Sequence, residues 1–296
     1  LYQTKAIKYN ISINKQKERK KMKKIGILLV LVLTLLLTSC KGEELNFGKE
    51  LVKVNGMVDI LTELDTKSSD VGIMDSIMAG YYINQQYKGK LTIVKDVVVA
   101  EEEYGIAARR DGAYTAKMIS KTIIDLAKDG TVDAIADKYG LKDSLAIDTT
   151  KNIDLSDETG KDDFDEIIKS GELVIGYTIF APIAYEDDNE LVGFDIDLAK
   201  AVCDALGIKA TFQVINWNSK VFELNSGAID VIWNGMTITD EIKESTSVTI
   251  AYLKNKQVAV VRVEDEAKYK TLDDMKDATI CVEAGSAGQL CVVKED

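Results

Sequence analysis

The sequence predicts an α/β fold with a mixed, mostly parallel sheet, and three features of residues 173–242 support that prediction. Leu173–Tyr177 is an apolar run whose length suits a buried strand. Residues 195–206 place apolar side chains on one helical face, and Gly207 stands where a glycine often ends a helix. A strand rich in β-branched residues follows at 210–215. The order strand, helix, strand is typical of a right-handed crossover between parallel strands.

The same stretch predicts where a ligand would bind. Asp195 is expected to cap the helix, and a second helix is expected at 218–226 before a strand at 229–233. In parallel sheets, ligands bind beyond the carboxyl ends of the strands. Residues 177–180 and 234–237 both lie at such ends.

Composition excludes several classes of function. The chain has 296 residues, enough for one or two domains, and a net charge of −12, which argues against nucleic acid as a partner. It has no histidine, the commonest general base and metal ligand. Its four cysteines lack zinc-type spacing. No cofactor and no metal are therefore expected.

The N-terminal region predicts a targeting segment. Lysines at 20–24 precede an apolar run, Ile25–Leu37, that is short for a transmembrane helix. The run ends in Leu-Thr-Ser-Cys, which resembles a bacterial lipobox, so Cys40 is expected to be lipidated and to hold the protein at the membrane. Residues 1–40 are then an upstream segment plus a lipoprotein signal peptide, with Met22 as the natural start. A retained signal anchor is the alternative.

Residues 41–150 also alternate helices and strands. The expected helices are 58–64, 76–86, 115–128 and 132–139, and the expected strands are 70–75, 91–94 and 104–108. Glu63-Leu64 precedes Asp70-Val71 by the same interval at which Glu223-Leu224 precedes Asp230-Val231. Chance is one explanation. The other is two similar lobes that each offer a polar residue to a shared cleft.

Three phrases resemble family-3 extracellular solute-binding proteins, the amino-acid-capturing subunits of ABC importers. They are Gly193-Phe-Asp-Ile-Asp-Leu-Ala199, Gly235-Met-Thr-Ile-Thr239 and Val282-Glu-Ala-Gly-Ser286. The resemblance implies a two-lobed, periplasmic-binding-protein-like (type II) fold. It also implies a non-enzymatic protein that captures an amino acid, delivers it to permease subunits and works outside the cytoplasm.

The resemblance also implies that the two halves of the fold stand in swapped order. Residues 45–103 with 264–296 would form lobe two, and residues 104–140 with 171–263 would form lobe one. The acidic residues 141–170 are expected to be a solvated linker. A circular permutation, a remnant of two truncated tandem proteins and a gene-assembly artefact all fit, as do a monomer and a swapped dimer.

Resemblance to the family also suggests the ligand-binding residues. Phe180 would stack on the ligand, Trp217 would form an apolar wall, and Asp75 would pair with an α-ammonium group. Polar contacts would come from Asn234, Gly235 and Thr237, and the backbone N–H groups of Gly285 and Ser286 would hold a carboxylate.

One position departs from the family. Ile242 stands where the family has the arginine that clamps the α-carboxylate, so the ligand's identity and affinity are open, and Ile242→Arg is expected to strengthen amino-acid binding. A degenerate fragment without ligand and an enzyme resembling dehydratases or transglycosylases of this fold are alternative functions. The pairing of Cys281 with Cys291 is also open.

Overall fold

The structure is a computed structural model that describes residues 43–294. The chain divides into two units, residues 1–44 and 45–296, and the second unit contains the fold described below. Cys40 and the expected signal peptide lie outside the described residues. Within residues 43–294, no helix combines the length and the apolar character needed to cross a membrane.

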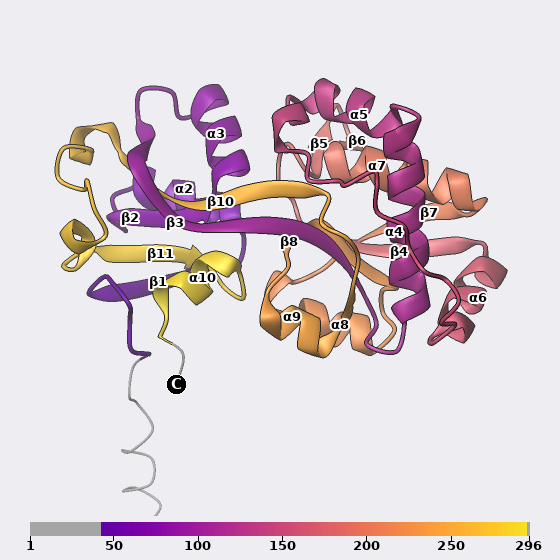
Figure 1. Cartoon of the computed structure of the whole chain (residues 1–296). Coiled ribbons are helices and arrows are strands. Elements are labelled where there is room, and N and C mark those ends of the chain that lie inside the picture. The colour runs from indigo at the N-terminus through magenta and orange to yellow at the C-terminus, as the bar shows by residue number, and fades with distance from the viewer. Residues whose placement is uncertain (1–42, 295–296) are drawn as a thin grey trace, which may run out of the picture. The chain divides into compact units, whose positions relative to one another are not determined.

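A nine-stranded sheet forms the centre of the second unit (Figure 1). Its main path has the order β1-β11-β2-β10-β3-β8-β4-β7, and β9 pairs with β3 beside this path. The pairs β1–β11, β11–β2, β8–β4 and β4–β7 are parallel, whereas β2–β10, β10–β3 and β3–β8 are antiparallel. The α/β class with a mixed sheet is confirmed. The strands are β1 (Glu50–Val54), β2 (Val71–Asp75), β3 (Leu91–Ala108), β4 (Glu172–Tyr177), β7 (Lys209–Val214), β8 (Val231–Thr237), β9 (Ser247–Val248), β10 (Leu253–Arg262) and β11 (Thr279–Glu283), and a separate hairpin joins β5 (Tyr185–Asp187) to β6 (Glu190–Val192).

Helices surround both ends of this sheet. Helices α2, α3 and α10 lie at the end formed by β1, β11 and β2, and α4 to α7 lie at the end formed by β4 and β7 (Figure 1). Their bounds are α2 (Met57–Asp65), α3 (Ser76–Gln85), α4 (Ala113–Lys128), α5 (Thr131–Tyr139), α6 (Lys161–Ser170), α7 (Phe194–Leu206), α8 (Lys220–Asn225), α9 (Asp240–Ser245) and α10 (Ala287–Val292), and a 3₁₀ turn, Trp217–Ser219, precedes α8.

The long strands β3 and β10 connect the two ends of the sheet. Two short strands were expected between residues 91 and 108, but the structure has one continuous strand. Its middle is charged and largely exposed, and two register shifts interrupt its pairing with β10. Pairing with β10 keeps the backbone of residues 95–103 extended between the two expected strands.

The C-terminal part of the predicted linker is a packed helix. Helix α6 buries Phe164 and Ile167, which pack in the core with α4. Arg109 donates from Nε to Asp163 at 2.7 Å and from Nη2 to Asp230 at 3.2 Å, so it ties α6 to the residue before β8. Most acidic residues of this segment are exposed, whereas Asp163 is largely buried and accepts from Arg109 and Thr115.

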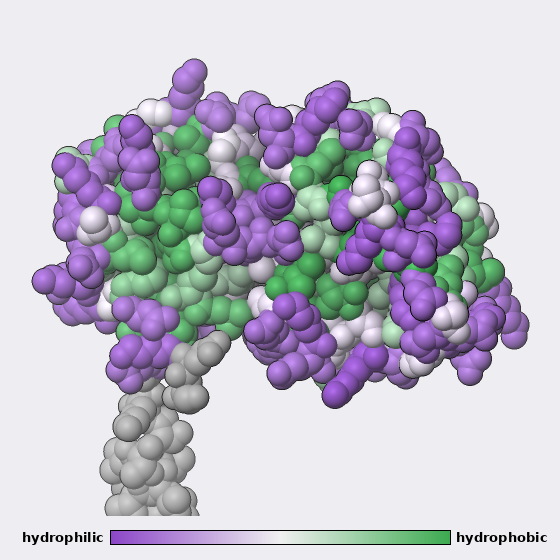
Figure 2. Space-filling model, viewed as in Figure 1, coloured by the Kyte–Doolittle hydropathy of each residue, from purple (hydrophilic) through white to green (hydrophobic). Residues whose placement is uncertain are grey.

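Apolar packing extends through the whole unit. The largest core cluster contains Met74 and Tyr104 together with Phe194 and Trp233, so it includes residues from both ends of the sheet. On the face shown in Figure 2, hydrophilic side chains are interspersed with smaller apolar areas. The parts of the sheet therefore share one core, and this core fixes the strand ends that form the site described next.

Candidate functional site

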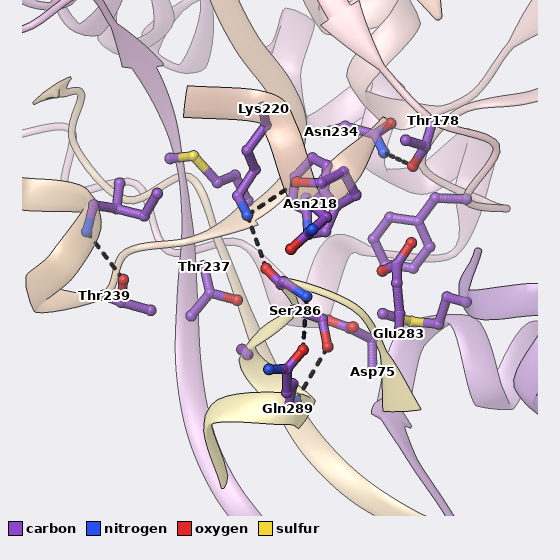
Figure 3. A pocket seen from close by; sticks show the side chains of 18 of the residues that line it. Asp75, Thr178, Asn218, Lys220, Asn234, Thr237, Thr239, Glu283, Ser286 and Gln289 are labelled. Carbon is purple, nitrogen blue, oxygen red and sulfur yellow. Dashed lines mark hydrogen bonds between the residues drawn. The ribbon is translucent and has the colours of Figure 1, made fainter. Parts of the chain in front are cut away.

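A pocket of about 300 Å³ lies where the ends of β2, β8 and β11 meet the 3₁₀ turn at Trp217 (Figure 3). All eight residues expected to bind a ligand line this pocket. They are Asp75, Phe180, Trp217, Asn234, Gly235, Thr237, Gly285 and Ser286. The fold thus brings together residues as far apart in the sequence as Asp75 and Ser286, and each one makes contacts that define what it offers to a ligand.

Asp75 is a buried carboxylate at the end of β2, with only 4% of its surface exposed. Its Oδ1 accepts hydrogen bonds from the Tyr104 hydroxyl and, at 2.5 Å, from Asn255 Nδ2. The same Asn255 amide donates to Glu102, so two carboxylates lie close together. Burial, and then the charge of Glu102, raise the pKa of Asp75 well above its usual range. A cation in the pocket would relieve both effects.

Phe180 rests directly on Gly235. The glycine has a φ of +59°, and a Cβ atom built there would lie 2.5 Å from Phe180 Cε1 and 3.2 Å from Tyr104 Cε2. Both the left-handed backbone and the aromatic rings therefore require glycine. Trp217 is 7% exposed and belongs at once to the pocket wall and to an apolar core cluster.

The polar groups of β8 are partly engaged. Thr237 donates to Glu102 Oε2 at 2.8 Å, and Asn234 Nδ2 donates to Thr178 Oγ1 at 2.8 Å. Asn234 Oδ1 is buried and has no hydrogen-bond partner among residues 43–294. Buried acceptors are normally satisfied, so this oxygen is suited to a donor on a ligand.

Asp195 binds the backbone of the pocket residue Gly235 instead of capping a helix. Helix α7 begins at Phe194, and its N-cap residue is Gly193, which makes no side-chain cap. A Cβ atom on Gly193 would lie 2.2 Å from the Ile183 carbonyl oxygen. The expected cap is therefore wrong. Asp195 Oδ2 instead accepts from the Gly235 N–H at 2.7 Å and from the Tyr252 hydroxyl at 2.8 Å, and burial raises its pKa to about 7.

The turn after β11 offers fewer free N–H groups than the sequence suggested. Gly285 N–H donates to Gln289 Oε1 at 2.9 Å, and Ser286 N–H donates to the Glu283 carbonyl at 3.3 Å. The Ser286 hydroxyl caps α10 by accepting from Gln289 N–H at 3.2 Å. A carboxylate would have to displace these partners to reach the two N–H groups.

Three charged pocket residues, Lys220, Glu241 and Glu283, were not among those predicted to bind a ligand. Lys220 lines the pocket beside Ile242, which is buried at 6% exposure. Burial lowers the pKa of Lys220 to about 8. Glu283 is 4% exposed, and burial raises its pKa to about 8 although Lys220 opposes the shift. A lysine at the start of a helix is usually solvated, so the position of Lys220 in the pocket was not predictable from the sequence.

The described residues show neither a metal site nor a disulfide. No group of histidine, cysteine, aspartate or glutamate residues in 43–294 is arranged to hold a metal ion. Cys281 and Cys291 are free thiols in this structure, as is Cys203. The chemistry available in the pocket is thus that of carboxylates, one ammonium group, amides and an aromatic ring.

Comparison with known proteins shows which family part of the chain resembles. Residues 173–290 match the model of bacterial extracellular solute-binding proteins, family 3. Over 123 residues the chain is 29% identical to the L-cystine-binding protein TcyJ of Escherichia coli (strain K12), covering 41% of this chain and 46% of that protein. Over 102 residues it is 36% identical to the ABC transporter arginine-binding protein 1 of the same organism, covering 34% and 41%.

A solved structure gives a similar partial match. It is a polar amino acid ABC uptake transporter substrate binding protein from Streptococcus thermophilus, 43% identical over 28% of this chain and 32% of that chain, with a TM-score of 0.27. The chain spans less than half the length of these relatives. The three motifs and the match across β4 to β11 lead to one conclusion: residues 173–290 of this chain are similar in sequence to family 3 of the bacterial extracellular solute-binding proteins.

Proposed function

We propose that this protein is the substrate-binding component of an ABC importer and that it captures an amino acid or a similar small polar solute. The observation that carries this proposal is the convergence of Asp75, Phe180 and Asn234 in one pocket, because each offers a different contact to such a ligand. Asp75 supplies a carboxylate for an ammonium group, Phe180 an aromatic surface, and Asn234 Oδ1 an unused acceptor.

The pocket environment favours an ammonium ligand over a neutral one. The pKa of Asp75 is raised because the ionised carboxylate is buried beside Glu102. An ammonium group placed against Asp75 would add the opposite charge that this carboxylate lacks, so binding and ionisation of Asp75 would support each other.

The proposal includes an extracytoplasmic location, lipidation at Cys40 and delivery of the ligand to permease subunits. The family match and the names of the relatives support a role in amino-acid transport outside the cytoplasm. The Leu-Thr-Ser-Cys sequence supports the anchor.

We also propose that the type II fold is assembled here from two segments in swapped order, with the lobe boundaries given above. Three strand pairings support this: β1 pairs with β11, and β3 pairs with both β8 and β10. Residues 41–140 and 141–296 expressed separately should each fail to unfold cooperatively and should regain a transition when mixed. Light scattering would distinguish a monomer from a swapped dimer. A cooperative transition from either segment alone, unchanged on mixing, would overturn the assembly.

A thermal-shift panel of L-amino acids, followed by calorimetry, tests the binding function. Asp75→Asn should weaken binding of any amino acid detected by roughly thirty-fold or more, because a charged hydrogen-bonded pair is worth about 2–5 kcal/mol. Glu101→Gln is the matched control, since Glu101 is an exposed carboxylate paired with Lys256 at 3.4 Å. Binding to no amino acid, or equal binding by wild type and Asp75→Asn, would contradict the proposal.

A further inference from the structure

Lys220 is the ammonium group of the pocket, and backbone carbonyl oxygens hold it, while the carboxyl groups of Glu283 and Glu241 lie nearby without forming an ion pair with it. Its Nζ donates to the Gly285 carbonyl at 2.8 Å and to the Trp217 carbonyl at 3.3 Å (Figure 3). It forms no ion pair with any carboxylate of residues 43–294. A lysine ammonium has three N–H donors, so two are used and one remains.

The position of the amino group is fixed from both sides of the pocket. Its Nζ lies over the Trp217 ring, 4.7 Å from the ring centroid. The Gly285 carbonyl belongs to the turn after β11, which packs so closely that a Cβ atom on Gly285 would lie 2.9 Å from Asn218 Cα. Lys220 therefore bridges the 3₁₀ turn and the β11–α10 turn, and its remaining donor lies in the pocket that both turns line.

The chemistry of such a group selects an anionic partner. A partly buried cation held by neutral carbonyl oxygens has lost water without making a close contact with an opposite charge, and the nearby Glu283 and Glu241 only partly offset that loss. A carboxylate would complete the third hydrogen bond and supply that charge. Ile242, at the position of the family's arginine, offers only apolar contact, so the cation comes from a different element.

We propose that Lys220 binds the carboxylate of the ligand and thereby takes the role that Ile242 leaves unfilled. The ligand class is then a small molecule with a free carboxylate, held by Lys220 at one end and, under the proposed function, by Asp75 at the ammonium end. This assignment rests on the proposed binding function and adds to it the group that recognises the carboxylate.

Matched pairs of an amino acid and its carboxamide separate this role from a merely structural one. The probes are L-arginine with L-argininamide and the corresponding pairs for L-histidine and L-glutamine, with succinate and acetate as carboxylates that lack an amino group. For the wild type we expect the carboxamide to bind roughly thirty-fold more weakly than the acid. Lys220→Met, which keeps the apolar stem, should reduce this discrimination to less than about three-fold.

Two further variants make the test specific. Lys243→Met removes an exposed lysine of α9 that pairs with Asp240 and should leave the discrimination unchanged. Lys220→Arg should retain it. Wild-type affinity for the acid should also fall above about pH 8 as Lys220 loses its proton. Lys220→Arg should retain only the part of that fall that comes from Glu283, whose pKa is also raised to about 8. Glu241 is the other carboxyl group close to Lys220.

Each outcome decides between the two proposals. Equal loss of acid and carboxamide affinity in Lys220→Met, or no loss, would overturn the carboxylate role and leave the binding function standing. Binding of succinate or acetate but of no amino acid, abolished by Lys220→Met, would uphold the carboxylate role and overturn amino-acid binding. Absence of binding by every probe would overturn both.

Discussion

Asp195 should make the stability of the protein depend on pH in a way that one substitution removes. The carboxyl group is 1% exposed, and its pKa rises from 3.8 to about 7 because burial disfavours the charged form. The folded chain therefore keeps a proton that the unfolded chain releases between about pH 4 and pH 7. Folding stability consequently falls as the pH rises through that window and levels off above it.

The magnitude follows from the shift. A rise of the Asp195 pKa from 3.8 to about 7 means that the free energy of unfolding is about 4 kcal/mol lower at high pH, where the carboxyl group is ionised, than at low pH. Between pH 4.5 and pH 6.5, Asp195 alone should lower the free energy of unfolding by about 2.5 kcal/mol. Asp195→Asn keeps an oxygen for the Gly235 N–H and the Tyr252 hydroxyl but cannot ionise.

Urea denaturation of wild type and Asp195→Asn across pH 4.5 to 8.5 measures the difference. Asp75 and Glu283 also have raised pKa values, so both proteins should lose stability as the pH rises. Between pH 4.5 and pH 6.5, the free energy of unfolding of Asp195→Asn should fall by about 2.5 kcal/mol less than that of the wild type. Parallel curves would refute the reasoning and would mean that Asp195 stays ionised in the folded protein.

Three further substitutions test the pocket and the anchor. Ile242→Arg should raise amino-acid affinity, measured by calorimetry, by up to about a hundred-fold in the Lys220→Met background. With Lys220 present the gain should be small, because the two cations would repel each other. An equally large gain in both backgrounds would contradict this. Gly235→Ala should lower the free energy of unfolding by about 1–3 kcal/mol more than Gly89→Ala. Both glycines have a positive φ, but a Cβ atom would clash with Phe180 at position 235 and would meet no atom within 4 Å at position 89. Equal losses would exclude the clash with Phe180. Cys40→Ser should move the protein out of the detergent phase and remove the mass of the lipid, and unchanged partitioning would exclude lipidation.

The strands and helices with strong local signals were predictable from the sequence. Helix α7 combines one apolar face with a terminal glycine at Gly207, which adopts a φ of +73°. Strand β4 was expected from Leu173 and begins at Glu172. In these segments local preference and tertiary packing agree, so pattern alone locates the element.

Other features depend on contacts between distant residues and could not be predicted from local pattern. The middle of β3 is a strand because β10 pairs with it, and α6 is packed because Arg109 and the α4 surface bind it. Lys220 is held in the pocket by its hydrogen bond to the Gly285 carbonyl. These two residues are 65 positions apart, so local pattern does not reveal the contact. The eight residues taken from the family resemblance do line one pocket, yet the ammonium group beside them became visible only in three dimensions.

The edge of the sheet formed by β1 and β11 affects the order in which the chain can fold. Asn46 donates to the Cys291 carbonyl across 245 positions, and Glu50 pairs with Thr279. A ribosome that makes the chain from its N-terminus therefore releases β1 long before its partner strand exists. Strands β4, β7 and β8 lie within 66 positions of one another, from 172 to 237, so their loops close sooner. During synthesis the segment from β4 to β8 should become compact first. Strand β1, although it is made earlier, should gain protection from hydrogen exchange only after β11 has been made.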